Sequence, residues 1–86
     1  MSEPLILHGE RYVTAHRAAE IYGVRVEWVL EVVDYGLLEP VEHVGAELAI
    51  AARLLDRLAT IHRLNVTQGV NLPGVAIILE LMERTP

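Results

Sequence analysis

Two short helical segments, each followed by a glycine, constrain the fold of this sequence most. Thr14 suits the N-cap of a helix over about 15–22, and Gly23 suits the left-handed residue that ends it. A second helix is predicted over about 26–35, with Gly36 after it. Helix, glycine turn and helix within so short a stretch have the size of a helix-turn-helix.

Short strands are predicted on both sides of this unit. Apolar residues at 5–7 and β-prone residues at 11–13 favour an N-terminal hairpin. A loop or wing is expected over 42–47 around Gly45, with a short return strand at 48–50. Extended segments are therefore expected both before and after the two helices.

Two further helices are predicted in the second half. Leucine and isoleucine recur at three- and four-residue steps over about 51–66, which is an amphipathic helical stripe. Asn71 suits the cap of a last helix that runs to about Arg84, with Pro73 in its first turn. The expected fold class is mostly α, with about four helices and short β-strands. We expect a single domain over 1–86, divided as 1–13 extended, 14–38 helix-turn-helix, 39–50 wing and 51–86 two C-terminal helices.

The composition limits the chemistry that the chain can carry. It has 86 residues, 52% of them apolar, and no cysteine, so it builds one core without disulfides or thiolate sites. The longest uncharged run, 64–79, contains polar residues and a proline and is not a membrane span. No basic region precedes an apolar run at the N-terminus, so we expect a cytoplasmic protein without a secretory signal.

The charge argues against nucleic acid as a partner. Seven arginines against twelve acids give a net charge of −5. Residues 1–43 hold three arginines and eight acids, whereas residues 44–86 hold four of each. Nucleic-acid binding needs the opposite sign, because phosphate contacts supply most of its affinity. We expect neither nucleic acid nor a membrane among the partners.

No residues have the spacing of a catalytic or metal site. The four histidines lack a mutual metal-ligand spacing, and no cysteine is present to complete a zinc site. No carboxylate pair, phosphate loop or nucleophile–base arrangement stands out, and a one-core domain leaves little room for a concave substrate site. We therefore expect a non-enzyme without a cofactor or a metal.

Two motifs resemble the DNA-binding domain of MerR-class proteins. Residues 69–75 (GVNLPGV), continuing into IL and L at 78–81, are similar to the end of that domain in MerR-class heat-shock repressors such as HspR. Residues 35–40 (YGLLEP) are similar to the end of the MerR helix-turn-helix. The resemblance covers about residues 11–83. It implies a MerR-like winged helix-turn-helix fold.

The departures from the DNA-binding pattern concern its arginines. The second MerR helix carries an R.T(L)R.Y pattern, and the corresponding places here include Glu27, Trp28 and Leu30. The arginines of the family's wing strand are replaced over 48–51, and two basic residues of the last helix are replaced by Ala76 and Ile77. A MerR-like fold without these charges resembles the CbpM/DafA family of chaperone modulators, whose ending resembles residues 72–82 (LPGVAIILELM).

This second resemblance implies a function in protein binding. The family's members are not enzymes; they bind a J-domain co-chaperone, or help to hold the chaperones DnaK and DnaJ together. The expected partners are therefore a DnaJ-type J-domain protein, DnaK, or both. The alternative is a MerR- or HspR-like regulator that binds DNA at heat-shock genes. A structural subunit that forms homo-oligomers is a further alternative.

The second helix carries an unusual outward pattern. Its acids Glu27, Glu31 and Asp34 fall on one narrow stripe at helical spacing. Trp28 and Tyr35 lie on one side of the stripe and Leu30 lies on the other. Carboxylates beside an aromatic side chain suit a basic helix of a partner, such as the basic helix of a J-domain. The alternative is that Trp28 belongs to the core and that the acids form a solvated face.

The last helix is more apolar than one core contact requires. Val75, Ile78, Leu79 and Met82 form the expected inward stripe, and Ile77 and Leu81 point away from it. Two large aliphatic residues off the core stripe are typical of contact with another subunit or a partner. The alternative is a helix buried on two sides within the monomer.

Overall fold

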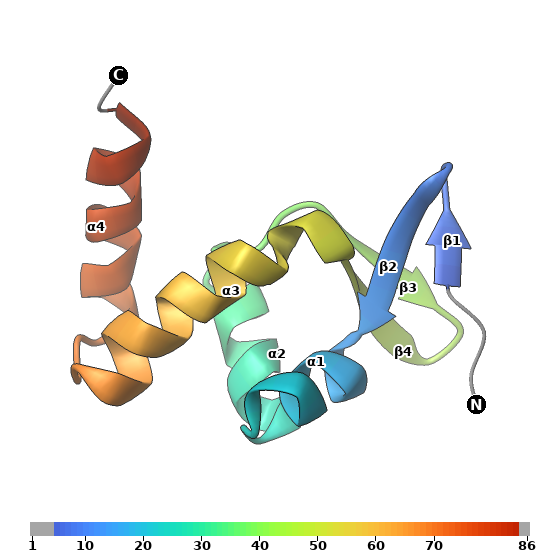
Figure 1. Cartoon of the computed structure of the whole chain (residues 1–86), viewed down its shortest axis with the longest axis horizontal. Helices are drawn as coiled ribbons and strands as arrows, with labels where there is room; N and C mark the ends of the chain where they lie inside the picture. The colour runs from blue at the N-terminus through green and yellow to red at the C-terminus, as the bar shows by residue number, and fades with distance from the viewer. Residues whose placement is uncertain (1–4, 85–86) are drawn as a thin grey trace.

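A computed structural model describes residues 5–84 and places a four-stranded sheet at one end and a projecting helix at the other (Figure 1). Residues 1–4 of the expected N-terminal segment and 85–86 of the expected last segment lie outside the described residues. The described elements are β1 (Leu5–Leu7), β2 (Glu10–Thr14), α1 (Ala15–Tyr22), α2 (Val26–Asp34), β3 (Val41–Val44), β4 (Glu47–Ala51), α3 (Leu55–His62) and α4 (Leu72–Arg84).

The sheet is antiparallel and has the order β1-β2-β4-β3. The predicted N-terminal hairpin is confirmed as β1–β2. The stretch expected to form a wing takes part in the β3–β4 hairpin, which turns at Gly45 with a φ of 63°. Residues 42–44, expected in a loop, belong to β3, and the return strand is longer than expected and runs to Ala51. Strand β4 also pairs with β2, where Val13 faces Ile50 and Tyr12 faces Ala51. This pairing attaches the β3–β4 hairpin to the strand that leads into α1.

The predicted helix-turn-helix is confirmed, with the caps where the sequence indicated them. The backbone N–H of Arg17 donates to Thr14 Oγ1 at 3.0 Å, which fixes the start of α1. Gly23 ends α1 with a φ of 63°, a conformation that favours glycine. Helix α2 ends at Asp34, with Tyr35 as its cap and Gly36 at a φ of 72°. The short turn therefore places α2 directly beside α1.

The helix predicted over 51–66 is interrupted at both ends. Ala51 is still in β4, a 3₁₀ turn follows over Ala52–Leu54, and α3 itself covers Leu55–His62. The end of the predicted helix is a π-helical turn, Arg63–Thr67. At the start, hydrogen bonding of β4 to both β2 and β3 overrides the helix propensity of the alanines.

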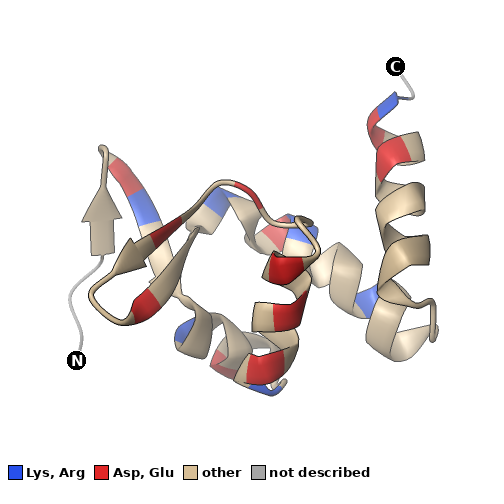
Figure 2. Cartoon of the chain, turned by 180° about the vertical axis from the view of Figure 1, so that it is seen from behind, with Lys and Arg blue, Asp and Glu red and all other residues tan. Residues whose placement is uncertain are grey.

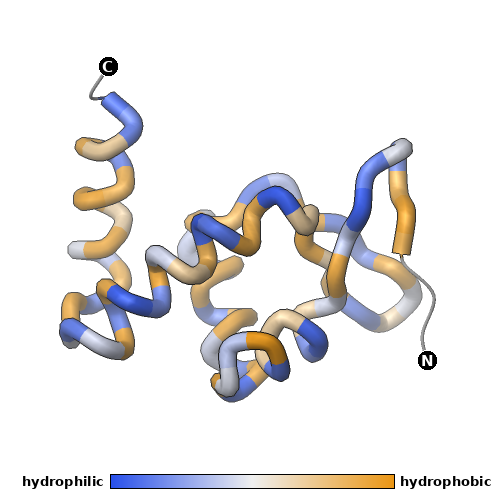
Figure 3. Tube along the Cα trace, in the orientation of Figure 1, coloured by the Kyte–Doolittle hydropathy of each residue, from blue (hydrophilic) through white to orange (hydrophobic). Residues whose placement is uncertain are grey.

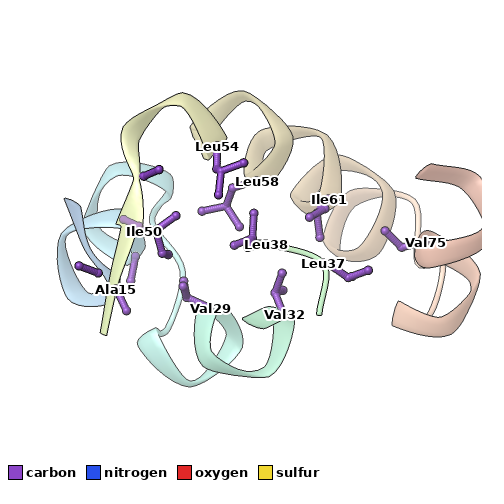
Figure 4. Close-up of a cluster of buried hydrophobic side chains, with 14 of the residues drawn as sticks. Ala15, Val29, Val32, Leu37, Leu38, Ile50, Leu54, Leu58, Ile61 and Val75 are labelled. Carbon is purple, nitrogen blue, oxygen red and sulfur yellow. The ribbon is translucent and has the colours of Figure 1, made fainter. Parts of the chain in front are cut away.

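The hydrophobic core lies between the helix-turn-helix, the sheet and α3 (Figure 4). Its largest fully buried side chains come from α2, β4, α3, α4 and the segment after α2: Val29, Val32, Leu38, Ile50, Leu58, Ile61 and Val75. Val75 extends the core towards α4. Burying such side chains stabilises the fold by about 1.5–3 kcal/mol each. Because α2 turns Val29 and Val32 into the core, its opposite face is exposed.

Helix α4 begins as the sequence predicts and then stands away from the rest of the chain (Figure 1). The backbone N–H of Gly74 donates to Asn71 Oδ1 at 2.9 Å, which confirms the cap. Arg57 of α3 hydrogen bonds to the Glu83 carboxylate and donates to the Leu37 carbonyl oxygen at 2.6 Å, which connects α4 to the exit of the helix-turn-helix.

Among the described residues, no helix is long and apolar enough to cross a membrane.

Candidate protein-binding surface

The outward face of α2 is acidic. Val29 and Val32 are fully buried on the inward face, so helical spacing directs Glu27, Glu31 and Asp34 to the solvent, where all three are exposed. Figure 2 shows that acidic positions recur along α2. The three acids expected to share a face therefore do so.

Glu27 stays ionised near neutral pH. Its own backbone N–H, at the start of α2, is the main group that lowers the pKa of the Glu27 carboxyl below its ordinary value. The Arg25 guanidinium, with Nε 3.4 Å from Glu27 Oε1, lowers that pKa further. Arg25 precedes α2, and the helix itself contains no lysine or arginine. The face therefore presents net negative charge.

Trp28 faces α3 and the turn after it. Its Nε1 donates to Asn65 Oδ1 at 2.8 Å, and its ring meets His62 edge to face with centroids 5.6 Å apart. The indole is half-buried and packs against the core. Trp28 therefore lies at the edge of the core, neither fully within it nor fully exposed, and a partner would reach only its exposed part.

Tyr35 and Leu30 lie on opposite flanks of the acidic stripe. Tyr35, at the C-terminal end of α2, is 52% exposed, and Leu30 is 40% exposed. Leu30 lies over a groove between α2 and the β3–β4 hairpin. Both side chains are accessible to a partner, and their role as contacts stays a prediction.

The groove beside Leu30 was not anticipated from the sequence, and it has a volume of about 440 Å³. Apolar side chains from α2 and the hairpin line it, and polar side chains stand around them. The apolar lining includes Val26, Leu30, Val33, Val41 and Leu48, and the polar lining is His16, Asp34, His43 and Glu47. The regular spacing of Val26, Leu30 and Val33 was a signal for a second apolar side of α2, but the opposite wall depends on the tertiary fold.

Helix α4 exposes aliphatic residues along its outer side, and Figure 3 shows hydrophobic residues over much of its length. Ile77 is 60% exposed and Leu81 is 57% exposed, so both point away from the core as predicted. Of the expected inward stripe, Val75 and Leu79 are buried and Ile78 is half-buried, whereas Met82 is 53% exposed. The prediction for Met82 was wrong because α4 leaves the core before its last turn.

The structure separates the eight residues predicted to bind a partner into two places. The exposed side of α2 and its C-terminal end hold Glu27, Leu30, Glu31, Asp34 and Tyr35, whereas Trp28 is turned towards α3. The other two, Ile77 and Leu81, lie on α4.

Over residues 5–84, no group of three or more histidines and acids is arranged to hold a metal ion.

Comparison with known protein families matches residues 13–86 to the family described as MerR HTH family regulatory protein. The chain belongs to this MerR family. The match includes the helix-turn-helix, the β3–β4 hairpin and the helices α3 and α4. The four helices and short antiparallel strands are compatible with a MerR-like domain. No solved structure matches this MerR-family chain.

Proposed function

We propose that this MerR-family chain is a non-enzymatic, cytoplasmic chaperone accessory protein that binds a J-domain co-chaperone, DnaK, or both. The observation that carries the proposal is the acidic outward face of α2, with Glu27, Glu31 and Asp34 all exposed. In a DNA-binding helix-turn-helix, the second helix enters the major groove of DNA. An acidic second helix is instead suited to a basic protein surface.

The β3–β4 hairpin also lacks the positive charge that DNA binding requires. In a winged reading of the fold, this hairpin is the wing, and together with α2 it forms the face that would meet DNA. The hairpin carries Glu42 and Glu47, and no lysine or arginine occurs over 41–51. Phosphate contacts need positive charge on this face. The proposal therefore replaces DNA binding by protein binding on the same surface.

The J-domain enters the proposal through the resemblance to the CbpM/DafA family. Members of that family modulate the DnaK–DnaJ system, and the helix by which a J-domain contacts DnaK is basic. Opposite charges on two surfaces speed their association and fix their register. The acids of α2 are the complementary charges on this chain.

Helix α4 provides a second surface in the proposal. Ile77 and Leu81 offer apolar area on the side of α4 away from the core. Such area suits a second chaperone or a second copy of this chain. Two separate surfaces would allow one small domain to hold two partners together without catalysis.

The alternative, a DNA-binding regulator of heat-shock genes, is equally compatible with the family match. A calorimetric titration of the chain with the J-domain protein of the same organism distinguishes the two. The proposal predicts saturable binding that weakens as salt rises, because surface charge pairs are screened. Lack of binding to the J-domain protein and to DnaK, together with a saturable footprint on a heat-shock promoter, would establish the alternative.

A further inference from the structure

The groove between α2 and the β3–β4 hairpin is an apolar hollow beside the acidic stripe. Leu30 and Val33 of α2 form one wall, and Val41 and Leu48 of the hairpin form the other. Its volume of about 440 Å³ is within the range of sites that hold small molecules, about 300–1,000 Å³. A groove of this size has room for a large side chain of a partner.

The two flanks of the acidic stripe differ in what they offer. On one flank, Trp28 is held by Asn65 and His62, so its indole packs within the chain. On the other flank, Leu30 is 40% exposed over the groove. A segment that pairs with Glu31 and Asp34 therefore meets an apolar groove on the Leu30 side. The other flank offers the exposed Tyr35.

The charges around the groove indicate the chemistry of its occupant. Asp34 lies on the α2 wall and Glu47 on the hairpin wall. Glu47 Oε1 is 3.2 Å from His16 Nδ1, so this contact between the hairpin and α1 forms part of the lining of the groove. No lysine or arginine lines the groove. An apolar floor between carboxylates suits an apolar side chain flanked by cations.

We infer that this groove is the anchor site for a basic segment of a partner protein, which inserts a large aliphatic or aromatic side chain between α2 and the β3–β4 hairpin. The inference rests on the proposed function and adds the position of its apolar contact. The lysines or arginines of that segment pair with Asp34, Glu31 and Glu47. Buried apolar anchors dominate the energy of most interfaces, whereas rim charges contribute less.

The test compares two substitutions at similarly exposed aliphatic residues. Leu30→Asp puts a charge over the groove, and Ile21→Asp puts the same charge on α1, outside the groove, at a residue that is 47% exposed. Each variant is titrated with the J-domain protein, and thermal unfolding shows that it is folded. We expect Leu30→Asp to weaken binding by about tenfold or more and Ile21→Asp by less than about threefold.

Methyl NMR of the unmodified chain supplies a second readout, which does not depend on the folding of a variant. Addition of the J-domain protein should shift the methyl signals of Leu30, Val33 and Val41. The role of the groove as anchor site would be overturned if the unmodified chain bound with these signals unchanged, or if Leu30→Asp bound as tightly as the unmodified chain. Either result would leave the proposed function standing. Shifts that appear with rising concentration of the chain alone would show that a second copy occupies it. Absence of binding by the unmodified chain would contradict the proposed function itself.

Discussion

The indole Nε1 of Trp28 donates a hydrogen bond to Asn65 Oδ1 across 2.8 Å, and this bond joins α2 to the π-helical turn after α3. The same amide donates from Nδ2 to the Val70 carbonyl oxygen at 2.7 Å. Asn65 therefore connects the helix-turn-helix to the segment that leads into α4. Its two hydrogen bonds hold the segment before α4 against α2.

Replacing Asn65 by alanine should lower the free energy of unfolding. The change removes two hydrogen bonds and leaves the partly buried Trp28 N–H without its acceptor, which costs about 1–3 kcal/mol. Urea unfolding followed by circular dichroism measures the difference. Val66→Ala, at the next residue and 51% exposed, is the control and should stay within about 0.5 kcal/mol of the unmodified chain. Equal stability of Asn65→Ala and the control would contradict this role.

Binding to duplex DNA should be undetectable at physiological salt up to micromolar protein. The chain carries a net charge of −5, and the outward side of α2 carries three acids. Phosphate repulsion therefore opposes every orientation in which α2 approaches the major groove. An electrophoretic mobility shift with a heat-shock promoter fragment is the measurement. A saturable shift in the presence of competitor DNA would refute the protein-binding account.

The outer side of α4 should be dispensable for folding and necessary for contact. Ile77→Asp with Leu81→Asp should leave the helical circular-dichroism signal intact, because both residues are more than half exposed. The double variant should lose self-association or partner binding, as measured by light scattering alone and with the chaperones.

The control on the same helix is Leu79→Ala. Leu79 is 4% exposed, so its truncation should destabilise the fold by about 2–5 kcal/mol. Unfolding of the double aspartate variant would show that the outer side of α4 belongs to the core. If the double aspartate variant self-associates and binds the chaperones as the unmodified chain does, this side of α4 is not an interface.

Local signals in the sequence were sufficient for most of the fold. Thr14, Gly23 and Asn71 act through their own backbone or side chain within a few residues, so each predicted helix boundary at these positions is confirmed. The N-terminal hairpin also follows from local signals, namely the apolar residues 5–7 and the β-prone residues 11–13. The start of α3 does not, because Ala51 is held in β4 by pairing with Tyr12, and its partner is distant in the sequence.

The candidate surface was predictable in its charges and less so in its shape. Helical spacing alone places Glu27, Glu31 and Asp34 on one stripe. The direction of Trp28 depends on Asn65, which is 37 residues away, and the groove depends on how the β3–β4 hairpin packs beside α2. A helical wheel has no information on either contact.

Charge reversal is the sharpest test of whether the acidic stripe of α2 binds the J-domain protein. Each of the single changes Glu27→Lys and Glu31→Lys should weaken binding to the J-domain protein by less than about 1 kcal/mol, because exposed charge pairs are weak. The double change should cost more than about 2 kcal/mol through like-charge juxtaposition. Glu20→Lys with Asp56→Lys is the control, since it makes the same change in net charge at exposed residues outside α2 and the hairpin.

The decisive measurement is a calorimetric titration of the J-domain protein against the α2 double variant and its control, at low and at moderate salt, with thermal melts to show that both are folded. The account predicts that the α2 double variant loses most of its affinity and its salt dependence, while the control binds nearly as the unmodified chain does. An α2 double variant that is folded and binds as tightly as the unmodified chain at both salt concentrations would contradict the account.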